Sequence, residues 1–179
     1  MKKKEEIYEI KRIKNKAHIK QLNQRIITIR AKTFINLQKT IESIISEEGA
    51  ALLYEASINA GKDTAKILIK KFKNKDFFKK LSKFYSSNGC GWFKIKKINI
   101  DPNKGGYIQI EQSFIAEEYG KSEKPVCDFL AGYFVGMLEE IYKKEYTCEE
   151  IKCIAKGDKY CEFKIEVVSN AFSINKEKE

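Results

Sequence analysis

The residues best suited to chemistry lie in the stretch TCEEIKCIAKGDKYCEF, residues 147–163, which holds three cysteines and three glutamates. If residues 155–159 form a hairpin loop between two strands, Cys153 lies directly opposite Cys161. The two sulfurs then share one face of the sheet and are close neighbours. The stretch therefore predicts a metal site, a disulfide, or a buried pair of thiols.

A closed metal site needs a third and a fourth ligand, and the sequence offers candidates for both. Cys127 stands in the first turn of a predicted helix, where backbone N–H groups and the helix dipole favour a thiolate. Cys148 and Glu150 share one strand face, but a regular strand directs both away from Cys153, so the strand must end or bulge near Lys152. Three thiolates with one carboxylate or a fourth thiolate suit structural Zn²⁺ in a tetrahedral shell.

The cysteine spacing alone leaves the alternatives to a metal open. The pattern C-x4-C-x7-C is not that of a standard zinc finger, and a reduced buried pair or a Cys153–Cys161 disulfide also fits it. A reducing compartment disfavours the disulfide, and the chain's five cysteines are an odd number. Three lysines near these cysteines are placed to offset the negative charge of a thiolate-rich site: Lys152, Lys156 and Lys159.

Composition bounds the class of protein. The 179 residues suffice for one domain with its own core, and 42% hydrophobic with 34% charged residues is typical of a globular chain. No apolar run reaches the roughly 18 residues that span a bilayer, and the N-terminus lacks the features of a signal peptide. We therefore expect a cytoplasmic protein. Its many Lys, Glu and Ile residues resemble a hyperthermophile composition.

The net charge of +10 points to an anionic partner or to a well-solvated surface. Lysines are densest in residues 66–84, and such a face could meet nucleic acid or an anionic membrane. A solvated face in a lysine-rich chain explains the same residues more simply, because charge alone is a weak signal.

The chain divides into an arm, a domain and a tail. Residues 1–24 are predicted to form a basic helix or arm, residues 25–168 a single domain, and residues 169–179 a flexible tail. Within the domain, the periodicity of apolar residues predicts helices over residues 34–45, 52–68, 76–85 and 124–142, and strands over residues 25–30, 91–100, 107–112, 146–154 and 160–168. A slip in the inward phase of the second strand predicts a β-bulge near Lys96.

No catalytic set is recognisable in the sequence. His18 is the single histidine and lies in the arm, so no Ser/His/Asp or Cys/His arrangement is expected, and GKD at residues 61–63 is not a P-loop. No glycine-rich fingerprint for a flavin or nicotinamide cofactor follows a strand. Aromatic residues where sheet meets helix are candidates for a ligand pocket or, more simply, for the core: Trp92, Phe93, Tyr107, Phe129, Tyr133 and Phe134.

Four segments give the chain a family resemblance: YEASINAGKDTAKIL, GCGWFKI, PVCDFLAGYFVGMLEEIY and, most specifically, EEIKCIAKGDKYCEF. From about residue 25 to residue 168 the chain resembles the 4-vinyl reductase domain family. Its relatives form the sensory domains of bacterial activators that bind phenols and other aromatic compounds. The resemblance implies an α+β fold, an antiparallel sheet packed on a helical layer, shared with haem-based nitric oxide sensors and TRAPP-type Golgi transport subunits.

The resemblance also implies a zinc shell and a homodimer. Matched by spacing, the family's three cysteines and one glutamate fall on Cys127, Glu150, Cys153 and Cys161, with Cys148 as an alternative fourth ligand. The family name implies a reductase, but without a cofactor signature we lean against an enzyme. The phenol sensors use a histidine to hold phenol, and this chain has none near its expected core.

Together these observations predict a zinc-stabilised, non-catalytic binding or sensor module for a small apolar or aromatic ligand. A nucleic-acid-binding zinc protein that uses the lysines of residues 66–84 is the first alternative. A dimeric scaffold or tether without any ligand, as the Golgi subunits would imply, is the second.

Overall fold

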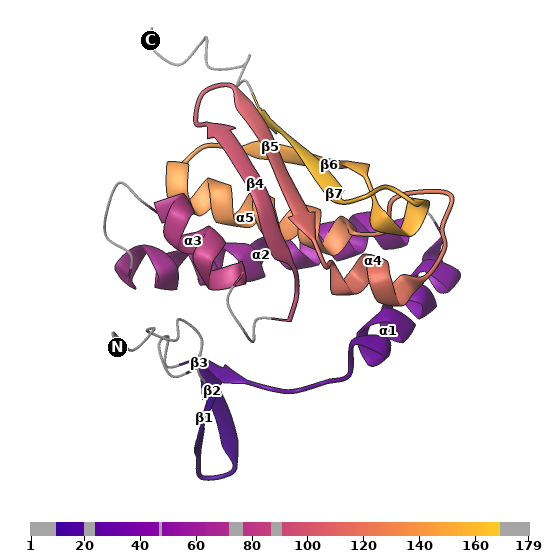
Figure 1. Ribbon diagram of the computed structural model, residues 1–179, viewed down its shortest axis with the longest axis horizontal. Coiled ribbons are helices and arrows are strands. Elements are labelled where there is room, and N and C mark those ends of the chain that lie inside the picture. The colour runs from indigo at the N-terminus through magenta and orange to yellow at the C-terminus, as the bar shows by residue number, and fades with distance from the viewer. Residues whose placement is uncertain (1–9, 20–23, 47, 72–76, 87–90, 169–179) are drawn as a thin grey trace, which may run out of the picture.

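The computed structural model describes residues 10–19, 24–46, 48–71, 77–86 and 91–168. An antiparallel four-stranded sheet in the order β4-β5-β7-β6 forms one layer, and helices form the other (Figure 1). The strands of this sheet are β4 (Lys94–Asp101), β5 (Gly105–Glu111), β6 (Tyr146–Lys152) and β7 (Cys161–Val167). The helices are α1 (Ala31–Ile45), α2 (Glu48–Lys71), α3 (Phe77–Ser86), α4 (Phe114–Tyr119) and α5 (Asp128–Tyr142). The predicted α+β class is confirmed.

The sheet has one buried and one exposed face, as the period-two pattern of β7 predicts. Cys161, Phe163 and Ile165 are buried, whereas Lys164 between them is exposed. The register of β4 against β5 shifts between Ile95 and Lys97, so the predicted bulge near Lys96 is confirmed.

Helix α5 links the sheet to the rest of the helical layer. Its Phe134 ring packs edge-on against Phe163 of β7, with 5.0 Å between the ring centroids. On its other side α5 lies against α2, and two glycines let the helix backbones meet. A Cβ atom on Gly132 or Gly136 would lie 2.0 Å and 1.9 Å, respectively, from carbonyl oxygens of α2. The α2–α5 pair is therefore a fixed support for the side chains that α5 presents.

The N-terminal segment is a small separate sheet, which projects below the main body in Figure 1. Its strands, in the order β1-β2-β3, are β1 (Ile10–Ile13), β2 (Lys16–Ile19) and β3 (Gln24–Ile26). The helix predicted within residues 1–24 is wrong for residues 10–19. Lys14 and Asn15 take φ values of 46° and 59°, so they form the two-residue turn of a β-hairpin instead of continuing a helix.

Several other predictions meet the structure only in part. The strand predicted over residues 25–30 ends at Ile26, and the following residues run unpaired into α1. The lysine-rich block of residues 66–84 divides between the end of α2 and α3, and its residues 72–76 lie outside the described part of the chain. Residues 1–9, Cys90 and the predicted tail, residues 169–179, also lie outside it. Among the described helices, none is long and apolar enough to cross a membrane.

Candidate metal centre and the adjoining cavity

Four potential ligand residues converge at one end of the sheet. Cys127 precedes α5, Glu150 lies on β6, Cys153 follows the end of β6, and Cys161 opens β7. One ligand atom from each of the four lies within 4.8 Å of all the others, and all four residues are buried. The structure therefore brings together the set that the family resemblance implies, and this metal cluster could hold a metal ion.

A break in β6 is what turns Glu150 and Cys153 toward the same point. The register of β6 against β7 shifts between Glu150 and Lys152, and the strand ends at Lys152, so the end or bulge that the site requires is present. The connection to β7 is longer than the predicted hairpin loop, because a 3-10 helix, η1 (Ile154–Lys156), follows the strand. The backbone N–H of Cys153 donates to Asp158 Oδ2 at 2.8 Å, which fixes the turn.

The carboxylate of Glu150 is held on one oxygen and left open on the other. Oε2 accepts hydrogen bonds from the backbone N–H groups of Cys127 at 2.9 Å and Val126 at 3.2 Å. Oε1 is buried and has no hydrogen-bond partner among the described residues. Desolvation, with a smaller contribution from Cys153, raises the pKa of the Glu150 carboxyl to about 8. A bound cation would satisfy the orphaned oxygen and favour the ionised carboxylate.

The three thiols of the cluster interact closely and are not joined as a disulfide in the structure. Hydrogen bonding to the thiols of Cys127 and Cys161 lowers the pKa of Cys153, whereas burial raises the pKa of Cys127. The backbone N–H of Ile154 donates to Cys161 Sγ at 3.4 Å. Three sulfurs and a carboxylate cannot all ionise side by side without a counter-charge, so this donor set fits a soft divalent cation.

Cys148 lies outside the metal cluster. Its side chain is buried on the core face of β6, next to α2, and its backbone N–H contacts the Tyr54 hydroxyl oxygen at 3.2 Å. The predicted lysine counter-charges are also not turned to the cluster. Lys152 Nζ pairs with Glu162 at 3.2 Å and with the Tyr160 hydroxyl at 3.1 Å, and the other two, Lys156 and Lys159, are exposed.

Sequence reasoning missed Ser113, whose Oγ lies 3.5 Å from Cys127 Sγ in the buried interior. Ser113 is the N-cap of α4, where its Oγ accepts from the backbone N–H of Ala116. A serine directly before the apolar run of a short helix is a capping signal that was available in the sequence.

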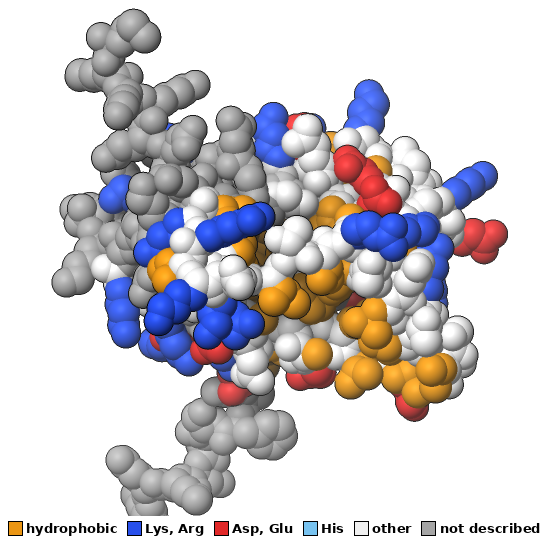
Figure 2. Space-filling view, turned by 90° about the horizontal axis from the view of Figure 1, so that it is seen from below, with side chains coloured by type: hydrophobic (Ala, Val, Ile, Leu, Met, Phe, Trp, Pro, Cys, Tyr) orange, Lys and Arg blue, Asp and Glu red, His pale blue; other side chains and the backbone are white. Residues whose placement is uncertain are grey.

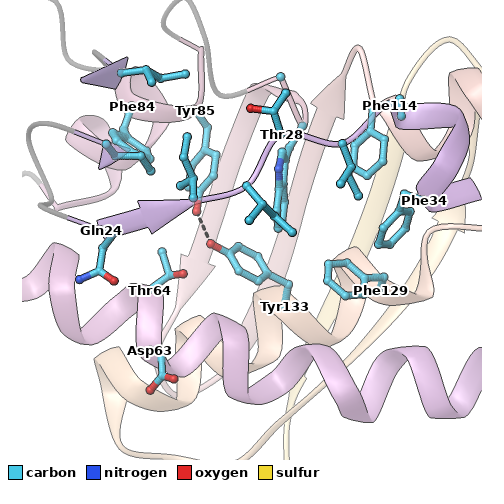
Figure 3. A pocket seen from close by; sticks show the side chains of 18 of the residues that line it. Gln24, Thr28, Phe34, Asp63, Thr64, Phe84, Tyr85, Phe114, Phe129 and Tyr133 are labelled. Carbon is cyan, nitrogen blue, oxygen red and sulfur yellow. Dashed lines mark hydrogen bonds between the residues drawn. The ribbon is translucent and has the colours of Figure 1, made fainter. Parts of the chain in front are cut away.

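A cavity of about 660 Å³ adjoins the metal cluster, between the N-terminal segment and the helical layer (Figure 3). Of the predicted pocket residues, Trp92, Phe129 and Tyr133 line it. Phe93 and Phe134 do not, because they are buried in the core and pack edge-on against each other at 5.4 Å. Tyr107 is also not among the lining residues; its ring lies 5.3 Å from Lys97 Nζ.

Most of the cavity wall could not be assigned from sequence. Phe34, Tyr85 and Phe114 line it together with isoleucines of the N-terminal segment, among them Ile19 and Ile26. These residues have ordinary core types and come from distant parts of the chain, so no local pattern marks them. Figure 2 looks onto this side of the molecule and shows hydrophobic side chains lining a hollow beside the lysines and arginines.

The metal cluster and the cavity share structural elements. Cys127 begins α5, and Phe129, two residues later, lines the cavity. Ser113 contacts the Cys127 sulfur, and Phe114 beside it lines the cavity. On α1, Gln38 Nε2 donates to the Val126 carbonyl at 2.8 Å. Three separate connections therefore join the two regions.

A family model for the 4-vinyl reductase (vinyl-4-reductase) domain matches residues 107–167. The uncharacterized protein MJ1642 of Methanocaldococcus jannaschii is 31% identical over 153 residues, which are 86% of this chain and 84% of that protein. The uncharacterized protein MJ0745 of the same organism is 39% identical over 88 residues, which are 49% of this chain. The matched part of the chain spans only 45% of the length of MJ0745.

Solved structures share the fold. The phenol-responsive sensory domain of the transcription activator PoxR, with phenol, has a TM-score of 0.70 at 18% identity and covers 88% of this chain and 84% of its own. A vinyl-4-reductase family protein of Methanocaldococcus jannaschii has a TM-score of 0.55 at 21% identity, with 80% and 84% covered. A trafficking protein particle complex subunit 3 of Naegleria fowleri, covalently bound to palmitic acid, has a TM-score of 0.54 at 13% identity, with 76% and 94% covered.

Proposed function

The chain belongs to the 4-vinyl reductase domain family, and on that premise we propose that it is a zinc-stabilised sensor module that binds a small apolar or aromatic ligand. The observation that carries the proposal is the cavity of about 660 Å³, walled by aromatic rings and built on the helix that begins at the metal cluster. Cavities of this size with mostly apolar walls are typical of small-molecule sites. The likeness in fold to a phenol-responsive sensory domain supports the same role.

Zinc is the metal that best fits the donor set. Soft thiolates select zinc over calcium or magnesium, and zinc accepts a tetrahedral shell of four protein ligands. With zinc–sulfur bonds of about 2.3 Å, the edges of such a tetrahedron measure about 3.8 Å. The ligand atoms of Cys127, Glu150, Cys153 and Cys161 lie within 4.8 Å of one another, so small movements would close the shell. A closed shell leaves no position for substrate, which favours a structural role.

Within this proposal, each residue of the metal cluster has a stated task. The three cysteine thiolates and Glu150 Oε1 would bind the zinc ion, which cross-links β6, β7 and the start of α5. Glu150 Oε2 would keep its hydrogen bonds to the N–H groups of Val126 and Cys127, and so orient the carboxylate. Fixing Cys127 also fixes the first turn of α5, which carries Phe129 into the cavity wall.

Ligand binding can be tested directly, because Trp92 is the chain's single tryptophan and lines the cavity. Titration with hydrophobic compounds should change Trp92 emission with saturation at one ligand per chain. Phe129→Ala should weaken this binding about tenfold, whereas Tyr142→Ala, at the far end of the same helix and not among the lining residues, should not. Unchanged emission with every compound of a broad aromatic and aliphatic set would contradict the proposed function.

We further propose a homodimer, formed through apolar side chains that the single chain leaves exposed. Ile27 is 76% exposed, Ile44 73%, Leu37 58% and Leu52 50%. Figure 2 shows hydrophobic side chains gathered at the right of this face, the side on which α1 lies in Figure 1. Exposed apolar patches of this kind mark association surfaces. Light scattering should give twice the chain mass of 20.8 kDa at micromolar concentration, and Ile44→Glu should shift it to the monomer mass.

A further inference from the structure

The cavity is larger than a single aromatic ring requires. Its volume is about 660 Å³. At roughly 30 Å³ for each non-hydrogen atom, the share that a water molecule takes in the liquid, a phenol of seven such atoms fills only about a third of that space. A ligand that displaces the water from these walls therefore needs on the order of 15–20 non-hydrogen atoms.

One end of the cavity is wholly apolar. Phe34 packs edge-on against Phe114 and Phe129, with ring centroids 5.3 Å and 5.2 Å apart (Figure 3). Trp92 continues this aromatic wall, 6.0 Å from Phe129 and 5.3 Å from Tyr133. The facing wall is aliphatic, since isoleucines of the N-terminal segment and Ile67 line it. These two walls suit an extended hydrocarbon body.

The opposite end carries the polar side chains. The hydroxyl groups of Tyr85 and Tyr133 share a hydrogen bond at 2.5 Å, and Gln24 and Thr64 lie at the same end of the view in Figure 3. Hydroxyl and amide groups can donate as well as accept hydrogen bonds. This end is therefore suited to a hydroxyl or carbonyl group of a ligand.

The polar end is not suited to an anion. Among the described lining residues there is no lysine or arginine, whereas Asp63 lies at the polar end. Lys66 Nζ sits 3.2 Å from Asp63 Oδ1, in an exposed pair, and is not part of the lining. A carboxylate or phosphate held here would lose its hydration next to a like charge, without a cation in the wall to replace it.

We propose that the cavity takes an elongated, uncharged amphiphile: a hydrocarbon body of a dozen or more carbons with a hydroxyl or carbonyl group at one end. The body lies between the aromatic wall and the isoleucines, and its polar group meets Tyr133 and its neighbours. This inference rests on the proposed ligand-binding function and narrows the class of ligand.

Three probes that differ in size and charge test the ligand class: 1-dodecanol, dodecanoate and phenol, each titrated at pH 7.5 against the full chain with Trp92 emission as the readout. Dodecanol should bind at least tenfold more tightly than either of the others. Dodecanoate binding as tightly as dodecanol would overturn the uncharged end, and phenol doing so would overturn the elongated body. No response to any of the three would count against the proposed function as well.

Two hydroxyl deletions test the polar end. Tyr133→Phe removes the hydroxyl at the cavity wall and should weaken dodecanol binding about fivefold. Tyr142→Phe makes the same change on the same helix at a residue outside the lining, and should leave the affinity unchanged. Circular dichroism and thermal melting show whether each variant folds. A folded Tyr133→Phe variant with the affinity of the parent chain would overturn the assignment of this end.

Discussion

The metal cluster and the cavity adjoin each other but are assembled differently. All four residues of the cluster come from residues 127–161, and the segment with three of them is a single strand–turn–strand unit. The cavity draws its walls from residues 10 to 133, on three strands, five helices and the segments between them. The cluster thus depends on local geometry and ligand chemistry, whereas the cavity depends on how distant elements pack.

This difference explains what could be predicted from the sequence. The ligand set follows from the family resemblance, carried by the cysteine spacing and the motif around Gly157 and Asp158, because few residue types bind a soft metal and the turn is local. The bulge near Lys96 follows from a slip in period. The cavity could not be predicted in the same way, since Phe34 and Phe114 look like any core phenylalanine until the fold brings them together.

Two expectations fail for physical reasons that a single sequence does not reveal. Residues 10–19 have isoleucines at near-helical spacing, but the turn at Lys14 and Asn15 and the pairing of Ile10 with Ile19 favour a hairpin. The sequence pattern assigns Phe93 and Phe134 to the pocket, whereas the structure places both in the core. Aromatic residues at the junction of sheet and helix can face either way, and only the packing decides.

The largest expected effect is the loss of a sulfur ligand. Cys161→Ser should abolish metal binding and lower the free energy of unfolding by on the order of 5 kcal/mol, which lowers the Tm of a chain of this size by roughly 10–20 °C. Cys148→Ser is the matched control, because Cys148 is buried on the neighbouring strand but lies outside the cluster. It should keep one metal ion per chain. Metal analysis and thermal melting measure both, and equal losses would mean that Cys148 belongs to the site.

Glu150→Gln should have a smaller effect, since the amide oxygen can still accept from the N–H groups of Val126 and Cys127. Loss of the negative charge should weaken metal retention against a chelator by about tenfold or more. Glu149→Gln, one residue earlier and exposed, should change nothing. Equal retention by both variants would remove Glu150 from the ligand set.

The same carboxyl gives a prediction for pH. In the metal-free protein the Glu150 pKa of about 8 lies above its ordinary value, so at pH 7 the group is mostly protonated, and a cation must displace about 0.9 of a proton. Metal affinity should therefore rise as pH increases toward 8. Calorimetry in buffers of different ionisation enthalpy should show about one proton fewer released by Glu150→Gln at pH 7. The same proton count for both proteins would contradict this role.

Coupling between the two regions should be weaker than either loss above. Because Cys127 and Ser113 tie the cluster to the elements that carry Phe129 and Phe114, removing the metal with a chelator should lower dodecanol affinity about fivefold. By reciprocity, saturating dodecanol should slow the transfer of metal to the chelator. Ligand affinity that is independent of metal content would show that the two regions share elements without being coupled.

The smallest effect is expected at the hairpin over the cavity. Asn15 has a φ of 59°, a conformation that glycine adopts more readily, so Asn15→Gly should stabilise the hairpin by about 0.5 kcal/mol. Dodecanol affinity should then rise by up to about twofold, while metal retention stays the same. A change in metal retention of similar size would mean that the hairpin influences the cluster as well as the cavity.

Native mass spectrometry tests the central claim most directly, because one spectrum reports metal, ligand and subunit number together. Protein purified without a chelator should carry one zinc ion per chain, and Cys161→Ser should carry none. Added dodecanol should bind at one molecule per chain. A parent chain with no zinc, and with two hydrogens missing from its mass as a Cys153–Cys161 disulfide requires, would contradict the account.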